Sequence, residues 1–257
     1  MTFDLTQYEN ETRQFTQRSG PIRFGSGISR FEYFWFSVFR VLWRRFYWRR
    51  MSESADSPTP IMPVPAAFQQ KNVEHCRLYA DRYEMLKSLP KGKVWAEVGT
   101  FKGAFAQKII DICQPSKLDL MDLTFDLVKK HGYVYESDTV TFYPGDSTSS
   151  LLKQPDKKYD FIYIDAGHDL INVASDTEAA LLKLKDDGMI IFNDYICFSH
   201  KEMRPYGVVP VVNSLVANGE WEVACFAFQN NMYCDIALRR AAVWAEQSAT
   251  LSAQMAS

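Results

Sequence analysis

Residues 159–168 read YDFIYIDAGH, and this stretch decides the fold expected of the chain. The apolar run at 161–164 is typical of a strand that is buried on both faces of a parallel sheet. Asp165 follows the run directly, and His168 comes three residues later. Because ligands of open α/β sheets bind at the carboxyl ends of the strands, an acid and an imidazole at this place indicate a functional site.

The segments on either side continue the pattern, because apolar strand-like runs alternate with helical ones. Strands are expected at 94–99, 118–123, 139–145, 159–165, 188–194, 221–228 and 232–239, and helices at about 68–88, 103–113, 124–131, 147–153, 170–185 and 207–218. This order predicts an α/β fold with a doubly wound, mostly parallel, seven-stranded sheet. The short link 229–231 forbids a parallel crossover, so the last two strands should form a hairpin that adds an antiparallel strand near the C-terminal end.

Composition divides the chain into four parts. We expect a basic, aromatic-rich arm at 1–50, a Pro/Ser-rich linker at 51–66, the α/β domain at 67–240 and a tail at 241–257. The arm carries nine Arg against four acids, a net charge of +5, whereas the remainder carries 20 basic against 27 acidic residues, a net charge of −7. An acidic main domain argues against binding to nucleic acid.

The arm contains one strong helical pattern. Residues 31–46 place aromatic and aliphatic side chains at i, i+3, i+4 and i+7, which predicts an amphipathic helix. The stretch is too short and too charged to span a bilayer. Two interpretations stay open: the helix packs on the domain or on a second copy in a homo-oligomer, or residues 29–50 lie in a membrane interface.

The cysteines and the N-terminus indicate the compartment. Five cysteines without C-x-x-C spacing predict reduced thiols, mostly buried, and the first 20 residues lack the apolar centre of a signal peptide. We therefore expect a cytoplasmic protein, with peripheral membrane association as the alternative for the arm.

The first strand end reads EVGTFKG, residues 97–103. Gly99 permits a tight turn with close approach of the backbone to a ligand, and Gly103 opens the next helix. The segment lacks the middle glycine of G-x-G-x-x-G, and Glu97 suits a ligand with a positive amine better than a pyrophosphate. The alternative is an ordinary turn between strand and helix.

The next two strand ends also carry acids. Asp122 has the position of a carboxylate that accepts hydrogen bonds from two ribose hydroxyls, or it caps the helix at 124–131. Asp146 is placed to accept from an adenine amino group, although Asp146 or Ser147 equally suits a helix cap.

Asp165 ends one strand, and Asn193 and Asp194 end the next. If these strands are neighbours, three side-chain oxygens meet at one edge of the sheet, which suits Mg²⁺. His168 lies one turn beyond Asp165 and titrates in the range of a general base for a substrate hydroxyl. The alternative interpretation is that His168 lies at a helix start and has no catalytic role.

Together these residues resemble the class I S-adenosylmethionine-dependent methyltransferases over about residues 70–240. The E-V-G-T-x-x-G segment is similar to their first glycine-rich motif, and Asp122 to their ribose-binding acid. The resemblance is closest to metal-dependent O-methyltransferases of the macrocin and mycinamicin type, which modify sugar hydroxyls. Asp165, Asn193 and Asp194 fit the metal ligands of that group, and D165-A-G-H168 fits its D-x-x-H base motif. Asn193 stands where that group often has Glu.

The resemblance implies a site and an activity. It implies a Rossmann-like methyltransferase fold, S-adenosyl-L-methionine as cofactor with Mg²⁺, and a hydroxyl of a small or glycosylated molecule as methyl acceptor. The implied cofactor-binding residues are Glu97, Gly99, Thr100, Gly103, Asp122, Asp146, Ser147 and Asp165, and the implied catalytic residues are His168 and Asp165. Two other functions stay open: a non-catalytic binding or scaffold protein that keeps the fold, and a membrane-surface enzyme that modifies a lipid-linked glycan.

Overall fold

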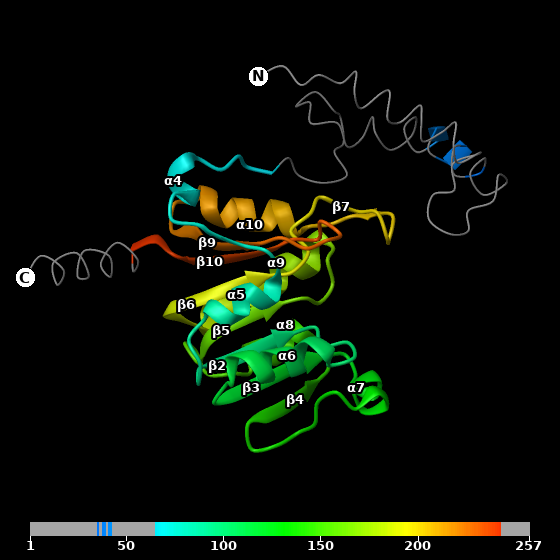
Figure 1. Ribbon diagram of the computed structural model, residues 1–257, viewed down its shortest axis with the longest axis vertical. Helices are drawn as coiled ribbons and strands as arrows, with labels where there is room; N and C mark the ends of the chain where they lie inside the picture. The colour runs from blue at the N-terminus through cyan, green and yellow to red at the C-terminus, as the bar shows by residue number, and fades with distance from the viewer. Residues whose placement is uncertain (1–34, 36–37, 40, 43–64, 243–257) are drawn as a thin grey trace, which may run out of the picture. The chain divides into compact units, whose positions relative to one another are not determined.

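The computed structural model describes residues 65–242 and five residues of the arm, Trp35, Val38, Phe39, Val41 and Leu42 (Figure 1). The chain divides into two compact units, Met1–Ile61 and Met62–Ser257. The five described residues of the first unit are helical. The rest of the helix expected at 31–46, nearly all of the linker, and the tail beyond residue 242 lie outside the described residues. The four-part division of the chain stays a prediction.

Strands and helices alternate along the second unit. The strands are β1 (Arg77–Tyr79), β2 (Val94–Val98), β3 (Lys117–Asp122), β4 (Val140–Pro144), β5 (Tyr159–Ile164), β6 (Leu184–Phe192), β7 (Phe198–Ser199), β8 (Arg204–Pro205), β9 (Trp221–Ala227) and β10 (Asp235–Arg240). The helices are α4 (Gln70–Val73), α5 (Arg82–Ser88), α6 (Ala104–Cys113), α7 (Asp126–His131), α8 (Ser147–Leu152), α9 (Leu170–Lys183) and α10 (Val208–Ala217).

The main sheet has eight strands in the order β1-β9-β10-β6-β5-β2-β3-β4. The strands from β9 to β4 are labelled in Figure 1. All neighbours pair in parallel except β10, which is antiparallel to both β6 and β9. The predicted α/β fold of the Rossmann-like methyltransferase type is confirmed, together with its C-terminal hairpin. The predicted strand number of seven was wrong.

The missed strand, β1, lies inside the helix expected at 68–88. That segment instead forms α4, β1 and α5. The carboxylate of Asp81 accepts hydrogen bonds from the backbone N–H groups of Tyr83 and Glu84, so a new helix begins at Arg82. Residues Arg77–Tyr79, which precede this cap, are extended and pair in parallel with the outer edge of β9. A strand of three residues has too little apolar alternation to be recognised in the sequence.

The core lies on both faces of the sheet. On one face, buried residues of α5, α6 and α7 pack against strand residues such as Trp95, Leu118 and Phe161. On the other face, α8, α9 and α10 pack against Ala96 and Ile162, among others. Strands covered on both faces explain the almost wholly apolar sequence of β5, all six residues of which are buried.

This arrangement brings the carboxyl ends of β2, β3, β4, β5 and β6 to one edge of the sheet. β6 starts at Leu184, earlier than expected, but ends so that Asn193 and Asp194 follow it directly. The loop after Asp194 carries a small hairpin of β7 and β8. Among the described residues, no helix is both long enough and apolar enough to cross a membrane.

Candidate active site

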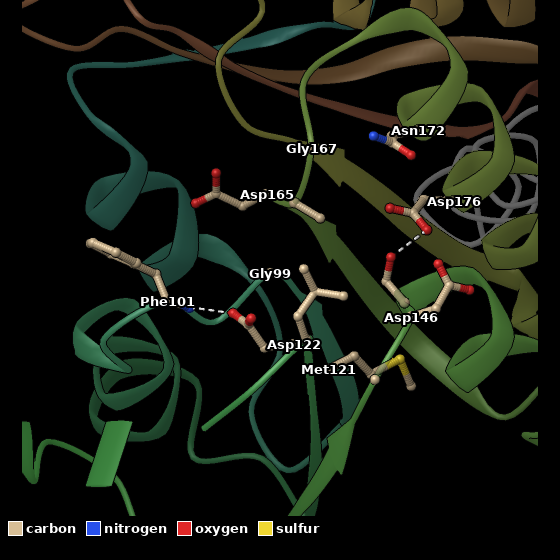
Figure 2. Close-up of a pocket in the computed structure, with 13 residues that line it drawn as sticks. Gly99, Phe101, Met121, Asp122, Asp146, Asp165, Gly167, Asn172 and Asp176 are labelled. Carbon is tan, nitrogen blue, oxygen red and sulfur yellow. Dashed lines mark hydrogen bonds between the residues drawn. The ribbon is translucent and has the colours of Figure 1, made fainter. Parts of the chain in front are cut away.

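A cavity of about 330 Å³ lies at the carboxyl ends of β2, β3, β4 and β5 (Figure 2). It is lined by Gly99, Phe101, Met121, Asp122, Leu123, Gly145, Asp146, Ser147, Asp165, Ala166, Gly167, Asn172 and Asp176. Five of the residues predicted to bind a cofactor therefore line one cavity, while Glu97, Thr100 and Gly103 stand outside its wall.

Gly99 forms the turn between β2 and α6. Its φ of +92° lies in the left-handed region, and a Cβ added there would stand 2.2 Å from the carbonyl oxygen of Asp165. Any side chain would therefore push apart the ends of β2 and β5. The close approach at this glycine occurs against the neighbouring strand end, and the expected approach to a ligand stays a prediction.

Asp122 fixes the same turn from the end of β3. Its Oδ2 accepts hydrogen bonds from the backbone N–H of Thr100 at 2.9 Å and from that of Phe101 at 2.7 Å, the second of which is drawn in Figure 2. Phe101, held by this bond, has a φ of +50° and lies on the cavity wall. The carboxylate thus shapes the turn while it faces the cavity. It does not cap the helix expected at 124–131.

Asp146 caps α8 and lines the cavity at the same time. Its Oδ1 accepts a hydrogen bond from the backbone N–H of Ser149 at 2.8 Å, and the hydrogen bonds from Ser149 lower the pKa of the carboxyl. Ser147 donates to Oδ1 of Asp176, on α9, at 2.8 Å. Asp176 was not predicted, because its only sequence signal is an acid inside a helix whose partners are 28 and 29 residues away.

Glu97 and Thr100 lie behind the cavity wall. Glu97 is 1% exposed, and both its Oε2 and the hydroxyl of Thr100 have no hydrogen-bond partner among the described residues. Burial and the nearby charge of Asp165 raise the pKa of Glu97 well above its usual value. Gly103, with a φ of +82°, precedes α6 and packs close to Val134. The absence of a side chain at Gly103 therefore lets Val134 pack against the start of α6.

A second polar group adjoins the cavity, where β5 and β6 end. Nε2 of His168 lies 3.6 Å from Oδ1 of Asp165 and 3.7 Å from Oδ2 of Asp194. Asn193 donates from Nδ2 to Oδ1 of Asp165 at 2.6 Å. Although 28 residues separate Asp165 from Asn193, the parallel pairing of β5 with β6 joins them, as the sequence predicted.

His168 is held on one face by an aromatic ring. It stacks on Tyr206, with ring centroids 4.5 Å apart and planes 12° apart. Burial lowers the pKa of His168 below its usual value, so the neutral imidazole predominates near pH 7. Its Nε2 is buried and has no hydrogen-bond partner within the described part of the chain. A neutral, oriented and unpartnered imidazole is competent to accept a proton.

The two acids beside His168 also titrate unusually. Burial raises the pKa of Asp165 to about 8 and that of Asp194 to about 6. Asp194 has a φ of +54°, which is uncommon for any residue other than glycine. Backbone strain of this kind concentrates at functional sites, so the φ of Asp194 supports a functional role for the turn after β6.

Asp165, Asn193 and Asp194 are the predicted ligands of a divalent cation. The described residues contain no group of three or more His, Cys, Asp or Glu side chains arranged to hold a metal ion. The predicted set has two carboxylates and an amide, and Oδ1 of Asn193 is buried without a hydrogen-bond partner in residues 65–242. Two carboxylates and an unpartnered amide oxygen fit a hard cation such as Mg²⁺ in their chemistry.

A closed ring of four side chains lies next to this group and was not predicted. Arg82 donates to Tyr163 and to Gln229, at 3.2 Å each. Tyr163 and Gln229 both donate to Asp235, at 2.7 Å each. The ring ties α5, β5 and the start of β10 together within two residues of Asp165. Arg82, Tyr163 and the pair of Gln229 and Asp235 are 66 or more residues apart in sequence, so no local motif predicts the ring.

Comparison with known proteins points to one class. Residues 96–195 match the Methyltransf_24 family model, described as a methyltransferase domain, over less than half of the 257-residue chain. The matched part runs from β2 to the turn after β6 and contains every residue that lines the cavity. No curated protein matches the chain.

Solved structures of methyltransferases are similar in fold. An S-adenosylmethionine-dependent methyltransferase of Mesorhizobium loti is 15% identical, with 61% of this chain and 96% of that chain covered and a TM-score of 0.46. The N-methyltransferase NodS of Bradyrhizobium japonicum is 14% identical over 62% and 94%, with a TM-score of 0.44. A ribosomal protein L11 methylase of Lactobacillus delbrueckii is 15% identical over 69% and 82%, with a TM-score of 0.45. At these identities the likeness concerns the fold alone.

The family match and the fold together indicate a class I S-adenosylmethionine-dependent methyltransferase. S-adenosylmethionine is the cofactor expected of such an enzyme.

Proposed function

We propose that the chain is an O-methyltransferase that moves the methyl group of S-adenosylmethionine to a hydroxyl of a small or glycosylated molecule. The observation that carries the proposal is the position of His168. Its unpartnered Nε2 lies between the carboxylates of Asp165 and Asp194, beside a cavity with room for a nucleoside. A hydroxyl acceptor, unlike a neutral amine, needs a base to take its proton as the methyl arrives.

The cofactor is proposed to lie along the cavity at the ends of β2, β3 and β4. Asp122 would accept from the ribose hydroxyls, and Asp146 from the amino group of the base. Glu97 has a buried carboxylate oxygen that lacks a partner among the described residues, and it would take the positive amine of the cofactor. When bound, the cofactor supplies an electrophilic sulfonium methyl group, so the chain's contribution is mainly alignment, which is worth up to about 7–11 kcal/mol in favourable systems.

His168 is proposed to receive the proton of the acceptor hydroxyl at Nε2. The lowered pKa keeps the imidazole neutral and ready to accept, and the carboxylate of Asp194, 3.7 Å from Nε2, would stabilise the imidazolium that forms. Such a base contributes on the order of 10²–10⁴-fold in rate. Tyr206 holds the ring in place through its stack.

Asp165, Asn193 and Asp194 are proposed to hold Mg²⁺, which when bound lowers the pKa of a coordinated hydroxyl. The support is the oxygen chemistry of this set and the unpartnered amide oxygen of Asn193. The base mechanism does not depend on the metal, so the two parts of the proposal are tested separately.

The hairpin of β7 and β8 is proposed to contact the acceptor. Tyr233 holds the hairpin through a hydrogen bond with Ser199 at 2.8 Å, and Lys201 lies over the same ring at 4.7 Å. Arg204 lies over the ring of Tyr206, which in turn stacks on His168. The hairpin is thus connected to the proposed base, which supports a contact between the hairpin and the acceptor.

The test has two stages. Calorimetry with S-adenosylhomocysteine comes first, and a folded protein that gives no binding heat rejects the function. Turnover is then followed by release of S-adenosylhomocysteine with a panel of hydroxylated and glycosylated acceptors. His168→Gln should keep the cofactor affinity and lose about 10²-fold or more in kcat. His131→Gln, on exposed α7, is the matched control. A product methylated on nitrogen overturns the O-methyl assignment.

The metal is tested on the same assay. Protein treated with EDTA should lose activity and regain it with Mg²⁺. Activity that is equal before and after treatment rejects the assignment of Asp165, Asn193 and Asp194 as ligands, and leaves the base standing.

A further inference from the structure

We propose that Asp176 is a positioning residue that gives the cavity its preference for a nucleoside base with an amino group. The inference rests on the proposed binding of S-adenosylmethionine in this cavity. It assigns the choice of base to a residue of α9, which lies on the same cavity wall as Asp146, the cap of α8.

Asp176 is buried and accepts two hydrogen bonds from the neighbouring helix, α8. It is 1% exposed, and its Oδ1 accepts hydrogen bonds from the hydroxyls of Ser147 at 2.8 Å and Thr148 at 2.7 Å. Burial raises the pKa of Asp176, while these two hydrogen bonds lower it. A carboxylate is costly to bury, so its place among two donors at a cavity wall calls for a function beyond packing.

The two hydroxyls belong to the first two residues of α8, directly after Asp146. The cap of this helix comes from Asp146 itself, through its bond to Ser149. Asp176 therefore fixes the first turn of α8 from the side, and with it the direction of the Asp146 carboxylate. Figure 2 shows Asp146 and Asp176 on the same wall of the cavity.

The cavity wall therefore presents the carboxyl groups of Asp146 and Asp176 side by side. Ionised carboxylates only accept hydrogen bonds, so a base that lies against them has to bring a donor. The exocyclic amino group of adenine is such a donor. The oxygen of hypoxanthine at the same place would face carboxylate oxygens and be repelled. The geometry thus points to discrimination between amino and oxo bases, maintained by Asp176 through α8.

The experiment compares two ligands by calorimetry: S-adenosylhomocysteine and its inosine counterpart, in which an oxygen replaces the amino group. Wild type should bind the adenine form more tightly by about tenfold or more, the worth of one hydrogen bond to a charged group. Asp176→Ala should weaken the adenine form and reduce this ratio severalfold. Asp176→Asn, which keeps an acceptor oxygen for both hydroxyls, should restore most of the ratio.

Thr177→Val is the matched control, because Thr177 is equally buried in α9 but bonds only within its helix, to the carbonyl of Val173. It should leave the ratio unchanged. A lower ratio of the two ligand affinities in this control would show that general loosening of α9 is enough to reduce base preference. That result would overturn the proposal.

The outcomes separate this inference from the proposed function. If wild type binds neither ligand, the function fails and this inference with it. If wild type binds but Asp176→Ala keeps the full ratio, the function stands and the inference is overturned. Should Asp176→Ala not fold, Thr148→Val removes one of the two bonds from a residue outside the cavity wall. It should reduce the ratio too, and an unchanged ratio overturns the proposal.

Discussion

The ring of Tyr206 stacks on the imidazole of His168, and Gly207, the residue after Tyr206, donates a backbone hydrogen bond to the carbonyl of His168 at 2.7 Å. Both residues are thereby fixed relative to one another. Since Nε2 of His168 has no hydrogen-bond partner in the described residues, the stack is the contact that sets the plane of the imidazole.

Loss of this stack should impair turnover more than binding. Tyr206→Leu removes the flat partner, and we expect kcat to fall about tenfold while the Kd for S-adenosylhomocysteine changes little, since Tyr206 is not on the cavity wall. Tyr206→Phe keeps the ring and should stay near wild type. Equal kcat in the Leu and Phe variants would show that the stack does not orient a base.

The turn at Gly99 should tolerate no side chain. A Cβ at this position would lie 2.2 Å from the backbone oxygen of Asp165, and φ is +92°. We expect Gly99→Ala to lower the free energy of unfolding by more than about 2 kcal/mol and to abolish binding of S-adenosylhomocysteine. Urea unfolding and calorimetry measure the two effects.

Gly219 is the matched control for backbone strain. Its φ is +79°, yet nothing lies within 4 Å of an added Cβ. Gly219→Ala should therefore cost only the left-handed strain of about 1–2 kcal/mol and leave binding intact. If both variants behave alike, the approach of the two strand ends is not what requires glycine at position 99.

The sequence was sufficient for the seven longer strands of the sheet and for the residues that follow them, but not for β1. Asp165, Asn193 and Asp194 could be placed together because parallel strands bring their carboxyl ends to one edge, whatever the loops do. The same rule placed Asp122 and Asp146 at the cavity. These predictions depend only on strand order and strand ends, which apolar runs reveal.

What the sequence could not give depends on packing between elements. Asp176 faces the cavity only because α8 and α9 lie together. Arg82 is linked to Asp235 only through Tyr163 and Gln229, which the fold brings beside α5. Glu97 stands at a strand end, but its burial behind Thr100 follows from the turn that Asp122 holds. Such contacts have no periodic or local signature.

Asp160 should make stability depend on pH in the acid range. Burial alone would raise the pKa of this carboxyl, but hydrogen bonds from Lys185 and from the backbone of Val94, both at 2.8 Å, outweigh it and lower the pKa. A carboxyl with a lowered folded-state pKa stabilises the fold above its unfolded pKa of about 3.9, and this stabilisation is lost as pH falls through the folded value.

Asp160→Asn should therefore lower the free energy of unfolding by about 1–3 kcal/mol at pH 7, and the difference from wild type should shrink below about pH 4. Asp111→Asn, an exposed acid paired with Lys108 at 3.8 Å, is the control and should change stability by less than about 0.5 kcal/mol. A difference for Asp160→Asn that persists unchanged at pH 3 would assign the effect to shape and not to charge.

Glu97 should make stability depend on pH in the opposite direction, and its ionisation should be coupled to cofactor binding. Burial and the charge of Asp165 raise its pKa well above the usual value. The folded state then holds a proton that the unfolded state releases above its ordinary pKa of about 4.3, so stability falls as pH rises from there toward the folded value. Glu97→Gln removes this loss, and we expect its Tm at pH 7 to exceed that of wild type by roughly 2–4 °C.

The same variant should bind cofactor less well. Oε2 of Glu97 is buried with no hydrogen-bond partner among the described residues, and the proposed amine would be its donor. A positive ligand favours the ionised carboxylate, which Gln cannot provide, so the Kd for S-adenosylhomocysteine should rise about tenfold or more. Near pH 4 the Tm values of variant and wild type should converge. A variant that is more stable at pH 7 and still binds normally would leave Glu97 as a buried acid without a part in the amine site.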